Sequence, residues 1–375
     1  MTIDEQGRRV LRKIPAPCRA ASLSCLLTGL AVHLYAFTNL IPNCDGLSRV
    51  YDLQQMTVSG RWFLHYASAL NQFTQMPMTI GLLSLIFLAL ASALAVDLLK
   101  IRSTALAGLT GAVMAAFPCL GYTFLYLFTA SAYCLAIFLA VLSVWLAARG
   151  RLGWLMGAAA LALSMGIYQA YASMAIALAV LAVLGETLDP KAELKSTWRL
   201  GLSFVLTLAA GAAAYYVILQ IFLKVKGLEL LSYLGMDAAS TGYPLGQLPR
   251  LVLDAYKQVI AFFFLPGAAN TFTSPFLTVL DLAALALGAL GLILALRTAG
   301  LELWRIAGAL VMLALLPLGI NFSQILSPFA PPTPLMKYAF VAVWLAVFLV
   351  LQKSERKLPR IITPVAAVWA AASGI

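Results

Sequence analysis

Charged residues are scarce in this sequence. Asp, Glu, Lys and Arg together make up 10% of its 375 residues, whereas 62% of the residues are hydrophobic. Soluble globular domains carry about 25% charged residues and roughly 45–50% apolar ones. A chain of this composition cannot cover itself with groups that water solvates. The composition therefore excludes a water-soluble fold and indicates an integral membrane protein.

Acidic residues and the usual metal ligands are also few. The chain has 14 Asp and Glu against 25 Lys and Arg, and its net charge of +11 would by itself suit a nucleic-acid partner. The basic residues, however, lie in short clusters between long apolar runs, which is the pattern of membrane topology. Two histidines and five cysteines have no metal-ligand spacing. The sequence therefore predicts neither nucleic-acid binding nor a zinc centre.

Eleven apolar segments approach the length of about 20 residues that a membrane-spanning helix needs. They lie at about 20–40, 78–98, 104–120, 122–147, 152–167, 169–186, 201–222, 276–296, 306–320, 335–352 and 361–375. If the N-terminal residues 1–19 are cytoplasmic, 18 of the 25 Lys and Arg residues fall inside and 7 outside, as the positive-inside rule requires. We therefore predict an all-α bundle of about 11 transmembrane helices that forms one transmembrane domain over residues 1–375.

Two segments on the outer side are long, 41–77 and 223–275, which are the first and the fourth extracytoplasmic segments. Each contains a stretch with an apolar face and a polar face. In the first stretch the apolar face consists of Trp62, Tyr66, Ala69, Leu70 and Phe73, and the polar face consists of Arg61, His65, Ser68 and Gln72. In the second stretch the apolar face consists of Leu251, Val252, Ala255, Val259 and Phe262, and the polar face consists of Arg250, Asp254, Lys257 and Gln258. This spacing predicts two interfacial helices, which together roof the outer mouth of the bundle.

Polar and aromatic residues also cluster at the predicted outer ends of the spans. Gly121-Tyr122-Thr123 follows the third span, Tyr168-Gln169 follows the fifth, Asn321-Phe322-Ser323-Gln324 follows the ninth, and Lys337 opens the tenth. The cytoplasmic ends show no comparable collection. We therefore expect the functional site on the outer side.

Three short motifs carry a family resemblance. Asp45-Gly46-Leu47-Ser48-Arg49 follows the first span, Gly60-Arg61-Trp62 opens the first interfacial helix, and Tyr168-Gln169 lies at an outer turn. In this order and placement they resemble the bacterial polytopic glucosyltransferases of the Gtr type. Those enzymes include the serotype-converting O-antigen glucosyltransferases and are similar to the wider GT-C superfamily. The motifs cover residues 20–190, and beyond that range only the hydrophobic pattern matches.

The resemblance implies a membrane glycosyltransferase that modifies a cell-envelope polysaccharide. It implies a polyprenyl-phosphate hexose, typically glucose, as the donor and an extracytoplasmic glycan or lipid as the acceptor. It places the active site on the outer face of a bacterial inner membrane, and a donor synthase and a flippase in the same pathway. An acidic residue in the first outer loop is the family's catalytic centre, which corresponds here to Asp45. Family members usually extend further, so we expect the chain to continue beyond Ile375.

The residues themselves support this chemistry. A carboxylate such as Asp45 can deprotonate the acceptor hydroxyl in an inverting transfer. The polyprenyl phosphate that leaves gains negative charge, which a guanidinium or ammonium can neutralise. The candidates for contact with the substrates are Arg49, Asp52, Arg61, Trp62, Tyr168, Gln169 and Lys337, of which Arg49, Arg61 and Lys337 supply cations.

Several simpler roles for these residues stay open. Asp45 beside Gly46 is also typical of a turn or a helix cap. The three cations could extend to lipid phosphates, and Trp62 and Tyr168 could be interfacial anchors. The sequence identifies no definite cofactor. A divalent cation such as Mg²⁺ or Mn²⁺ on Asp45 and Asp52 is an open alternative, but their separation matches no recognised metal motif.

Two other function classes compete with the enzyme. A transporter or flippase for a lipid-linked saccharide should place polar groups at mid-bilayer and show internal repeats, and the sequence shows neither. An O-antigen polymerase or ligase should carry Arg-rich outer loops, whereas only seven basic residues are predicted outside. The polar residues at the outer ends favour the glycosyltransferase.

Overall fold

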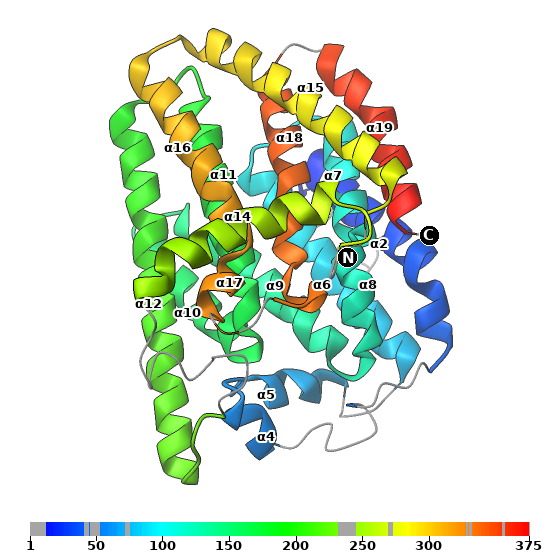
Figure 1. Cartoon of the computed structure of the whole chain (residues 1–375), viewed down its shortest axis with the longest axis vertical. Coiled ribbons are helices and arrows are strands. Elements are labelled where there is room, and N and C mark those ends of the chain that lie inside the picture. Colours follow the sequence, from blue (N-terminus) through cyan, green and yellow to red (C-terminus); the bar gives the residue numbers. More distant parts are fainter. Residues whose placement is uncertain are drawn as a thin grey trace, which may run out of the picture.

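The structure is a computed structural model of the chain, and it describes residues 13–40, 45, 53–71, 76–231, 245–268, 273–327, 329, 332–354 and 357–374. These residues are mainly helical, and no strand occurs among them. The long helices lie side by side in one bundle, with α12 (Leu194–Lys226) along one edge and α2 (Ala16–Thr38) near the other (Figure 1). The predicted all-α fold class is confirmed.

Most of the predicted segments correspond to long apolar helices. Seven helices among the described residues are long and apolar enough to cross a membrane: α2, α6 (Pro77–Leu98), α9 (Leu127–Ala147), the η2–α11 helix (Gln169–Thr187), α12, α15 (Pro275–Ala299) and α16 (Leu303–Ile320). The bent pair α7 (Thr104–Ala116) and α8 (Pro118–Leu125) would make an eighth. Three shorter apolar helices are α10 (Gly153–Ile167), η5–α18 (Tyr338–Lys353) and α19 (Lys357–Ser373). The number of helices that cross the membrane stays a prediction.

The boundary between the third and fourth predicted segments is wrong. The sequence places it near residue 121, but the structure has two breaks around that position. One lies between Ala116 and Pro118, where α7 and α8 differ in direction by 40°, and the other lies at Tyr126, before α9 begins at Leu127. Proline lacks a backbone N–H and disfavours a helical conformation in the residue before it. Phe117 is accordingly extended, with ψ of 126°. Gly121-Tyr122-Thr123 therefore lies inside α8 and not at an outer turn.

Local signals explain where several helices begin. The Ser103 hydroxyl accepts a hydrogen bond from the Leu106 N–H at the start of α7, and Ser274 caps α15 in the same way. Glu193 and Ser196 form a capping box at the start of α12. Each cap satisfies backbone N–H groups that have no partner inside the helix. Because these caps are polar, they mark helix ends that reach the surface of the bundle.

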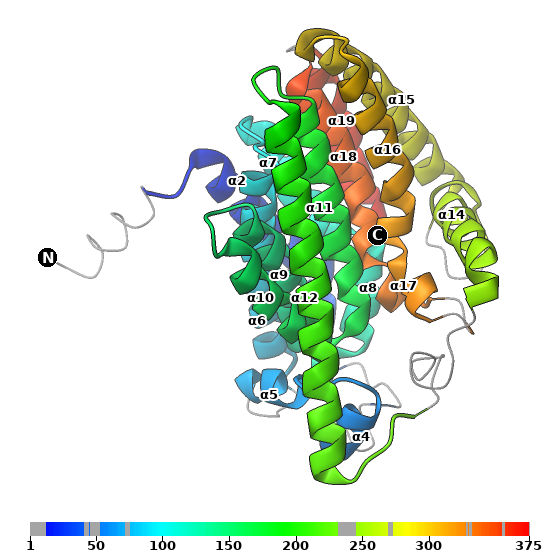
Figure 2. The ribbon, with the colours of Figure 1, turned by 90° about the vertical axis from the view of Figure 1, so that its left-hand side faces the viewer.

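The two ends of the bundle differ in charge. The turns that follow α6, α9, α11 and α15 lie at the same end of the bundle, and those after α11 and α15 are uppermost in Figure 1. Basic residues gather on these turns and at the adjoining helix ends, namely Lys100, Arg102, Arg149, Arg151, Lys191, Lys195, Arg199, Arg297, Arg305 and Lys353. We call this the basic end. The short helices α4 (Leu53–Val58) and α5 (Leu64–Ser68) cover the opposite end (Figure 2).

The stretch predicted as the first interfacial helix contains a short helix, α5. Residues 72–75 lie outside the described residues, and Trp62 precedes α5 in a turn. Leu64, Ala67, Ser68 and Asn71 face the bundle, while Tyr66 and Leu70 are exposed. Of the predicted apolar face, Trp62 is therefore buried in the bundle, whereas Tyr66 and Leu70 lie on the surface of the protein. The placement of this helix in the membrane interface stays a prediction.

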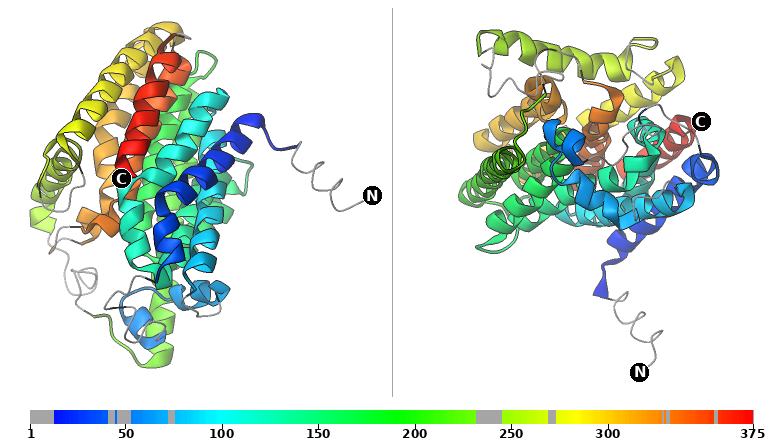
Figure 3. Two further views of the ribbon diagram at one scale, coloured as in Figure 1. Left: turned by 90° about the vertical axis from the view of Figure 1, so that its right-hand side faces the viewer. Right: turned by 90° about the horizontal axis from the view of Figure 1, so that it is seen from below.

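The second predicted amphipathic helix forms as expected but lies elsewhere. It is α14 (Leu248–Phe264), and Leu251, Ala255, Val259 and Phe262 of its apolar stripe are buried. The helix packs on α16 and α17 (Phe322–Leu326) along one flank of the bundle, whereas α4 and α5 cover the end (Figures 2 and 3). The predicted roof made by both helices together is therefore wrong, because apolar contacts with α16 hold α14 to the side.

Candidate functional site

The candidate site is built on the loop that follows α4 at the opposite end. Gly60 has a left-handed φ of 78°, and the N–H groups of Gly60 and Arg61 donate to the carbonyls of Thr57 and Met56. This arrangement ends α4, and glycine adopts it without the steric cost of a side chain. In the motif Gly60-Arg61-Trp62, the glycine therefore fixes the end of α4 and the positions from which the side chains of Arg61 and Trp62 extend.

Gln169 and Tyr215 hold this loop from distant parts of the chain. The Gln169 amide donates to the Ser59 carbonyl over 3.2 Å and to the Tyr215 hydroxyl over 2.9 Å. The Tyr215 hydroxyl in turn donates to the Gly60 carbonyl over 3.0 Å. The two side chains come from the turn between α10 and α11 and from α12. The motif Tyr168-Gln169 is thus joined directly to the motif that contains Arg61.

Trp62 is a packing residue in this structure. Its side chain is buried beside Phe63 and Phe222, with ring centroids 5.7 and 5.8 Å away. A Cβ atom on Gly166 would lie 2.7 Å from the indole ring, so only glycine leaves room for it there. The Phe63 N–H also donates to the Gly166 carbonyl over 2.7 Å. The buried ring of Trp62 is therefore neither an exposed surface on which a sugar could stack nor an anchor among lipid headgroups.

Arg61 lies against a cluster of tyrosines. Its guanidinium carbon is 4.6 Å from the centroid of the Tyr168 ring, and its Nη1 donates to the Tyr133 hydroxyl over 3.3 Å. The Tyr133 and Tyr168 rings are stacked 5.0 Å apart, and Tyr171 meets both edge-on. Stacking on an aromatic face orients a guanidinium without neutralising it. The half-buried Arg61 side chain is thus held against the tyrosine cluster at this end of the bundle.

Two residues of this cluster were not predicted from the sequence. Tyr133 and Tyr215 lie within long apolar segments, where single tyrosines are common. The signal that could have found them is the position of their hydroxyl groups, which need partners when buried. The sequence contains no indication that these partners are Arg61, Gln169 and Gly60, because the contacts join residues from 46 to 155 positions apart.

A second polar group lies where α14 meets α17. The Asn321 amide donates to Gln258 Oε1 and to the Ala255 carbonyl, and the Gln258 amide donates to Gln324 over 2.6 Å. Asn321 and Gln324 are buried. The predicted polar cluster at Asn321-Phe322-Ser323-Gln324 is therefore a hydrogen-bonded seam that fastens α14. Lys337 is also buried, in the turn between η4 (Pro334–Met336) and η5 (Tyr338–Val341).

The acidic candidates are described only in part. Asp45 is exposed and follows the end of α2. Arg49 and Asp52 lie outside the described residues. Among the described residues no group of three or more His, Cys, Asp or Glu side chains is placed to hold a metal ion. The predicted base is thus accessible, while its pairing with Asp52 stays a prediction.

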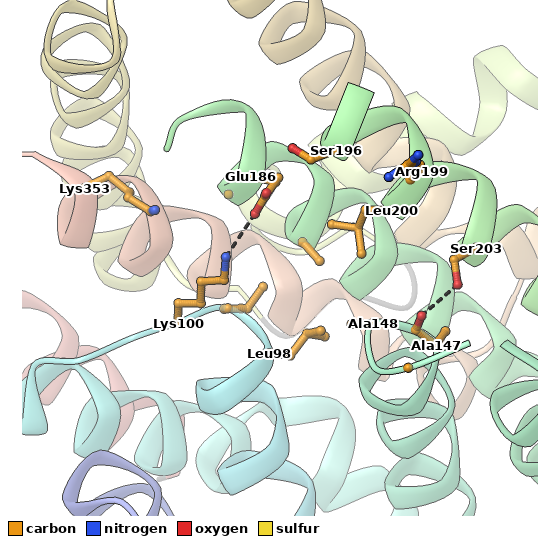
Figure 4. Close-up of a pocket in the computed structure, with 14 residues that line it drawn as sticks. Leu98, Lys100, Ala147, Ala148, Glu186, Ser196, Arg199, Leu200, Ser203 and Lys353 are labelled. Carbon is orange, nitrogen blue, oxygen red and sulfur yellow. Dashed lines mark hydrogen bonds and ion pairs between the residues drawn. The ribbon is translucent and has the colours of Figure 1, made fainter. Parts of the chain in front are cut away.

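A cavity lies at the other end of the molecule. It has a volume of about 410 Å³ and is lined at the basic end by Lys100, Glu186, Arg199 and Lys353, with small and apolar residues between them (Figure 4). It is therefore not the outer cavity beside Asp45 that the sequence predicts.

Comparison with known proteins identifies the family. The family model described as "Glucosyl transferase GtrII" matches residues 34–351 of the chain. No curated protein and no solved structure gives a significant match. The matched range contains every candidate residue from Asp45 to Lys337, and the predicted Gtr-type resemblance is confirmed. With most of its length matched, the chain belongs to the GtrII glucosyl transferase family, and its apolar helices are those of a membrane glucosyltransferase.

Proposed function

We propose that this chain transfers a glucosyl group from a polyprenyl-phosphate donor to an extracytoplasmic glycan or lipid acceptor, with inversion and with Asp45 as the general base. In this proposal the chain is a GT-C-like protein of the bacterial inner membrane. Its N-terminus and its basic end lie in the cytoplasm, in accordance with the positive-inside rule. The end covered by α4 and α5 lies outside, and the product is a modified O-antigen or a related envelope polysaccharide.

The observation that carries the proposal is the assembly of the family motifs. Gly60-Arg61-Trp62 and Tyr168-Gln169 are far apart in the sequence but interlock through Gln169 and through the stacking of Arg61 on Tyr168. Asp45 follows α2, whose C-terminal end lies at the same end of the bundle (Figure 3). A glucosyltransferase needs a base and a cation near each other, and this end supplies both residue types.

The reaction can be written from these groups. The Asp45 carboxylate accepts the proton of the acceptor hydroxyl, whose oxygen forms the new bond to C1 of the glucosyl group. The bond between C1 and the phosphate oxygen breaks, and the polyprenyl phosphate leaves with the electron pair. The Arg61 guanidinium neutralises the charge that grows on this phosphate. Gln169 and Tyr215 are positioning residues, because they hold the loop that carries Arg61.

A donor assay tests the proposed function. The purified full chain in bilayer nanodiscs is supplied with polyprenyl-phosphate glucose or with UDP-glucose, together with envelope glycan extracted from cells that lack the gene. We expect glucose to reach the glycan from the lipid-linked donor only, as detected by mass spectrometry. Transfer from UDP-glucose with no use of the lipid-linked donor would overturn the proposed donor class.

Replacing Arg61 by alanine is expected to raise the KM for the lipid-linked donor by about tenfold, which corresponds to ~1.4 kcal/mol. The reason is that a charged hydrogen bond to the donor phosphate is lost. Initial rates measured against donor concentration give this KM. Arg250→Ala is the matched control, because Arg250 is an exposed arginine on α14 away from the motifs. An unchanged KM in Arg61→Ala would remove this residue from the donor site.

A further inference from the structure

The cavity at the basic end lies between five parts of the chain. The end of α6, the turn after α9, the end of α11, the start of α12 and the end of α18 each contribute to its lining. We call it the basic-end cavity. Its volume of about 410 Å³ is in the range of small-molecule sites. The proposed transfer site does not use any of its residues, so a different ligand is required to explain it.

The charges around the cavity leave one cation in excess. Lys100 Nζ is 2.9 Å from Glu186, which also lines the cavity, and Lys353 Nζ is 3.0 Å from Asp189. Each lysine therefore has one carboxylate. Arg199 is exposed, and within the described part of the chain no carboxylate lies within the 4.0 Å of an ion pair with it. Figure 4 shows Arg199 and Lys100 on two sides of the same space.

Lys100 occupies a backbone conformation that normally belongs to glycine. Its φ is +54°, and no other non-glycine residue among those described has a positive φ. The Lys100 N–H donates to the Asp97 carbonyl and the Ile101 N–H to the Val96 carbonyl, which is the usual way to end a helix with glycine at this position. A lysine here lowers stability relative to glycine. The chain nevertheless has a lysine at this position, and the lysine lines the cavity.

The surroundings of the cavity are typical of the headgroup level of a membrane. Trp198, next to Arg199, is 71% exposed on the outer face of α12. Trp145, Trp154 and Trp304 lie at the same end, at the end of α9 and the starts of α10 and α16. Tryptophan is enriched where a membrane meets water. Leu98, Leu99 and Leu200 form part of the cavity wall, so an apolar chain can lie beside a charged head.

We propose that the basic-end cavity binds a phosphate-bearing anion through Arg199 and Lys100. The planar guanidinium of Arg199 presents paired N–H donors that match two phosphate oxygens. Lys100 adds a point charge while Glu186 keeps it in place. The phosphate belongs either to the headgroup of an anionic lipid or to a soluble phosphate, and both present the same oxygens. The site is separate from the transfer site, because the two lie at opposite ends of the bundle.

The thermal stability of the purified full chain tests the proposal. The protein is placed in nanodiscs of phosphatidylcholine alone, of phosphatidylcholine with phosphatidylglycerol, or of phosphatidylcholine with added inorganic phosphate. The test variant combines Lys100→Gly with Arg199→Gln. Glycine relieves the left-handed backbone, so the unliganded variant should unfold no earlier than the parent protein. Its apparent affinity for the stabilising anion is expected to fall by about tenfold.

The matched control combines Lys191→Gln with Lys195→Gln, which removes the same charge at the same end but outside the cavity lining. Stabilisation by phosphatidylglycerol that the test variant alone loses identifies a lipid headgroup. Stabilisation by inorganic phosphate that the test variant alone loses identifies a soluble anion. If both variants respond to each anion as the parent protein does, the cavity is not a phosphate site.

Discussion

Replacement of Asp45 by asparagine is expected to reduce glucosyl transfer by about 10²–10⁴-fold, which is the usual contribution of a positioned general base. Asparagine has nearly the same shape as aspartate but cannot accept the proton of the acceptor hydroxyl. Because the Asp45 side chain is exposed, its replacement should leave the fold intact, and a folding defect would not explain such a loss. The measurement is transfer from the lipid-linked donor by purified protein at matched concentrations.

Asp254→Asn supplies the control for this comparison. Asp254 lies on α14 within 4.0 Å of Arg250 and Lys257, and the proposed reaction assigns it no role. We expect Asp254→Asn to transfer glucose at the parent rate. Full turnover by Asp45→Asn would remove Asp45 as the base. The catalytic base would then have to be sought elsewhere in the chain.

Replacement of Arg305 by alanine is expected to have the largest effect on stability, about 3 kcal/mol or more, because it removes a buried and fully paired charge. The Arg305 guanidinium donates to the carbonyls of Thr187 and Asp189, over 2.9 and 2.7 Å, and to those of Pro190 and Ala192. It thereby ties the end of α11 to the start of α16. Without it, each of these carbonyls loses the donor that Arg305 supplies, although that of Asp189 keeps the Ala192 N–H as another donor.

The thermal midpoint in detergent measures this effect. We expect Arg305→Ala to unfold at least about 5 °C below the parent protein. Arg305→Lys should also be destabilised, since one ammonium cannot reach four carbonyls. Arg297→Ala is the control because Arg297 is exposed at the same end. Equal midpoints for Arg305→Ala and Arg297→Ala would show that the carbonyl network does not hold the turn.

The turn after α11 also contains Asp189, whose carboxylate pairs with Lys353 at the end of α18. Burial raises the pKa of the Asp189 carboxyl, but hydrogen bonds from Lys353 and from the Lys191 backbone outweigh this and hold the pKa below its ordinary value. The Asp189 carboxyl therefore stays ionised at neutral pH. Its contribution to stability is present above the ordinary carboxyl pKa and is lost only as the pH falls through the lowered one.

The sequence predicts the helices well because apolar runs of fixed length are a local property. It places one break near residue 121, whereas the structure has breaks at Phe117 and at Tyr126, because Pro118 disfavours a helical conformation in Phe117 within an otherwise continuous apolar run. It also places α14 wrongly over the outer mouth. The stripe of Leu251, Ala255 and Val259 predicts an amphipathic helix, but a stripe alone does not indicate whether lipid or another helix covers it.

The candidate site could be predicted only as a set of motifs. Arg61, Trp62, Tyr168 and Gln169 were found from their order along the chain, and the structure brings them together. Their individual contacts were beyond prediction, since the burial of Trp62 depends on the glycine at position 166 of another helix. The basic-end cavity was missed for a similar reason. Lys100 and Arg199 look like ordinary cytoplasmic charges until the fold places them around one space.

Side-specific labelling tests the central claim, that the end bearing Asp45 faces away from the cytoplasm. A cysteine at position 45, in a variant that also carries Cys44→Ser, is compared with a cysteine in place of Lys191 at the basic end. Cys18, Cys25, Cys119 and Cys134 are buried and should not react. With a membrane-impermeant maleimide on spheroplasts, position 45 should be labelled and position 191 only after lysis. Labelling of position 191 but not of position 45 would contradict the account.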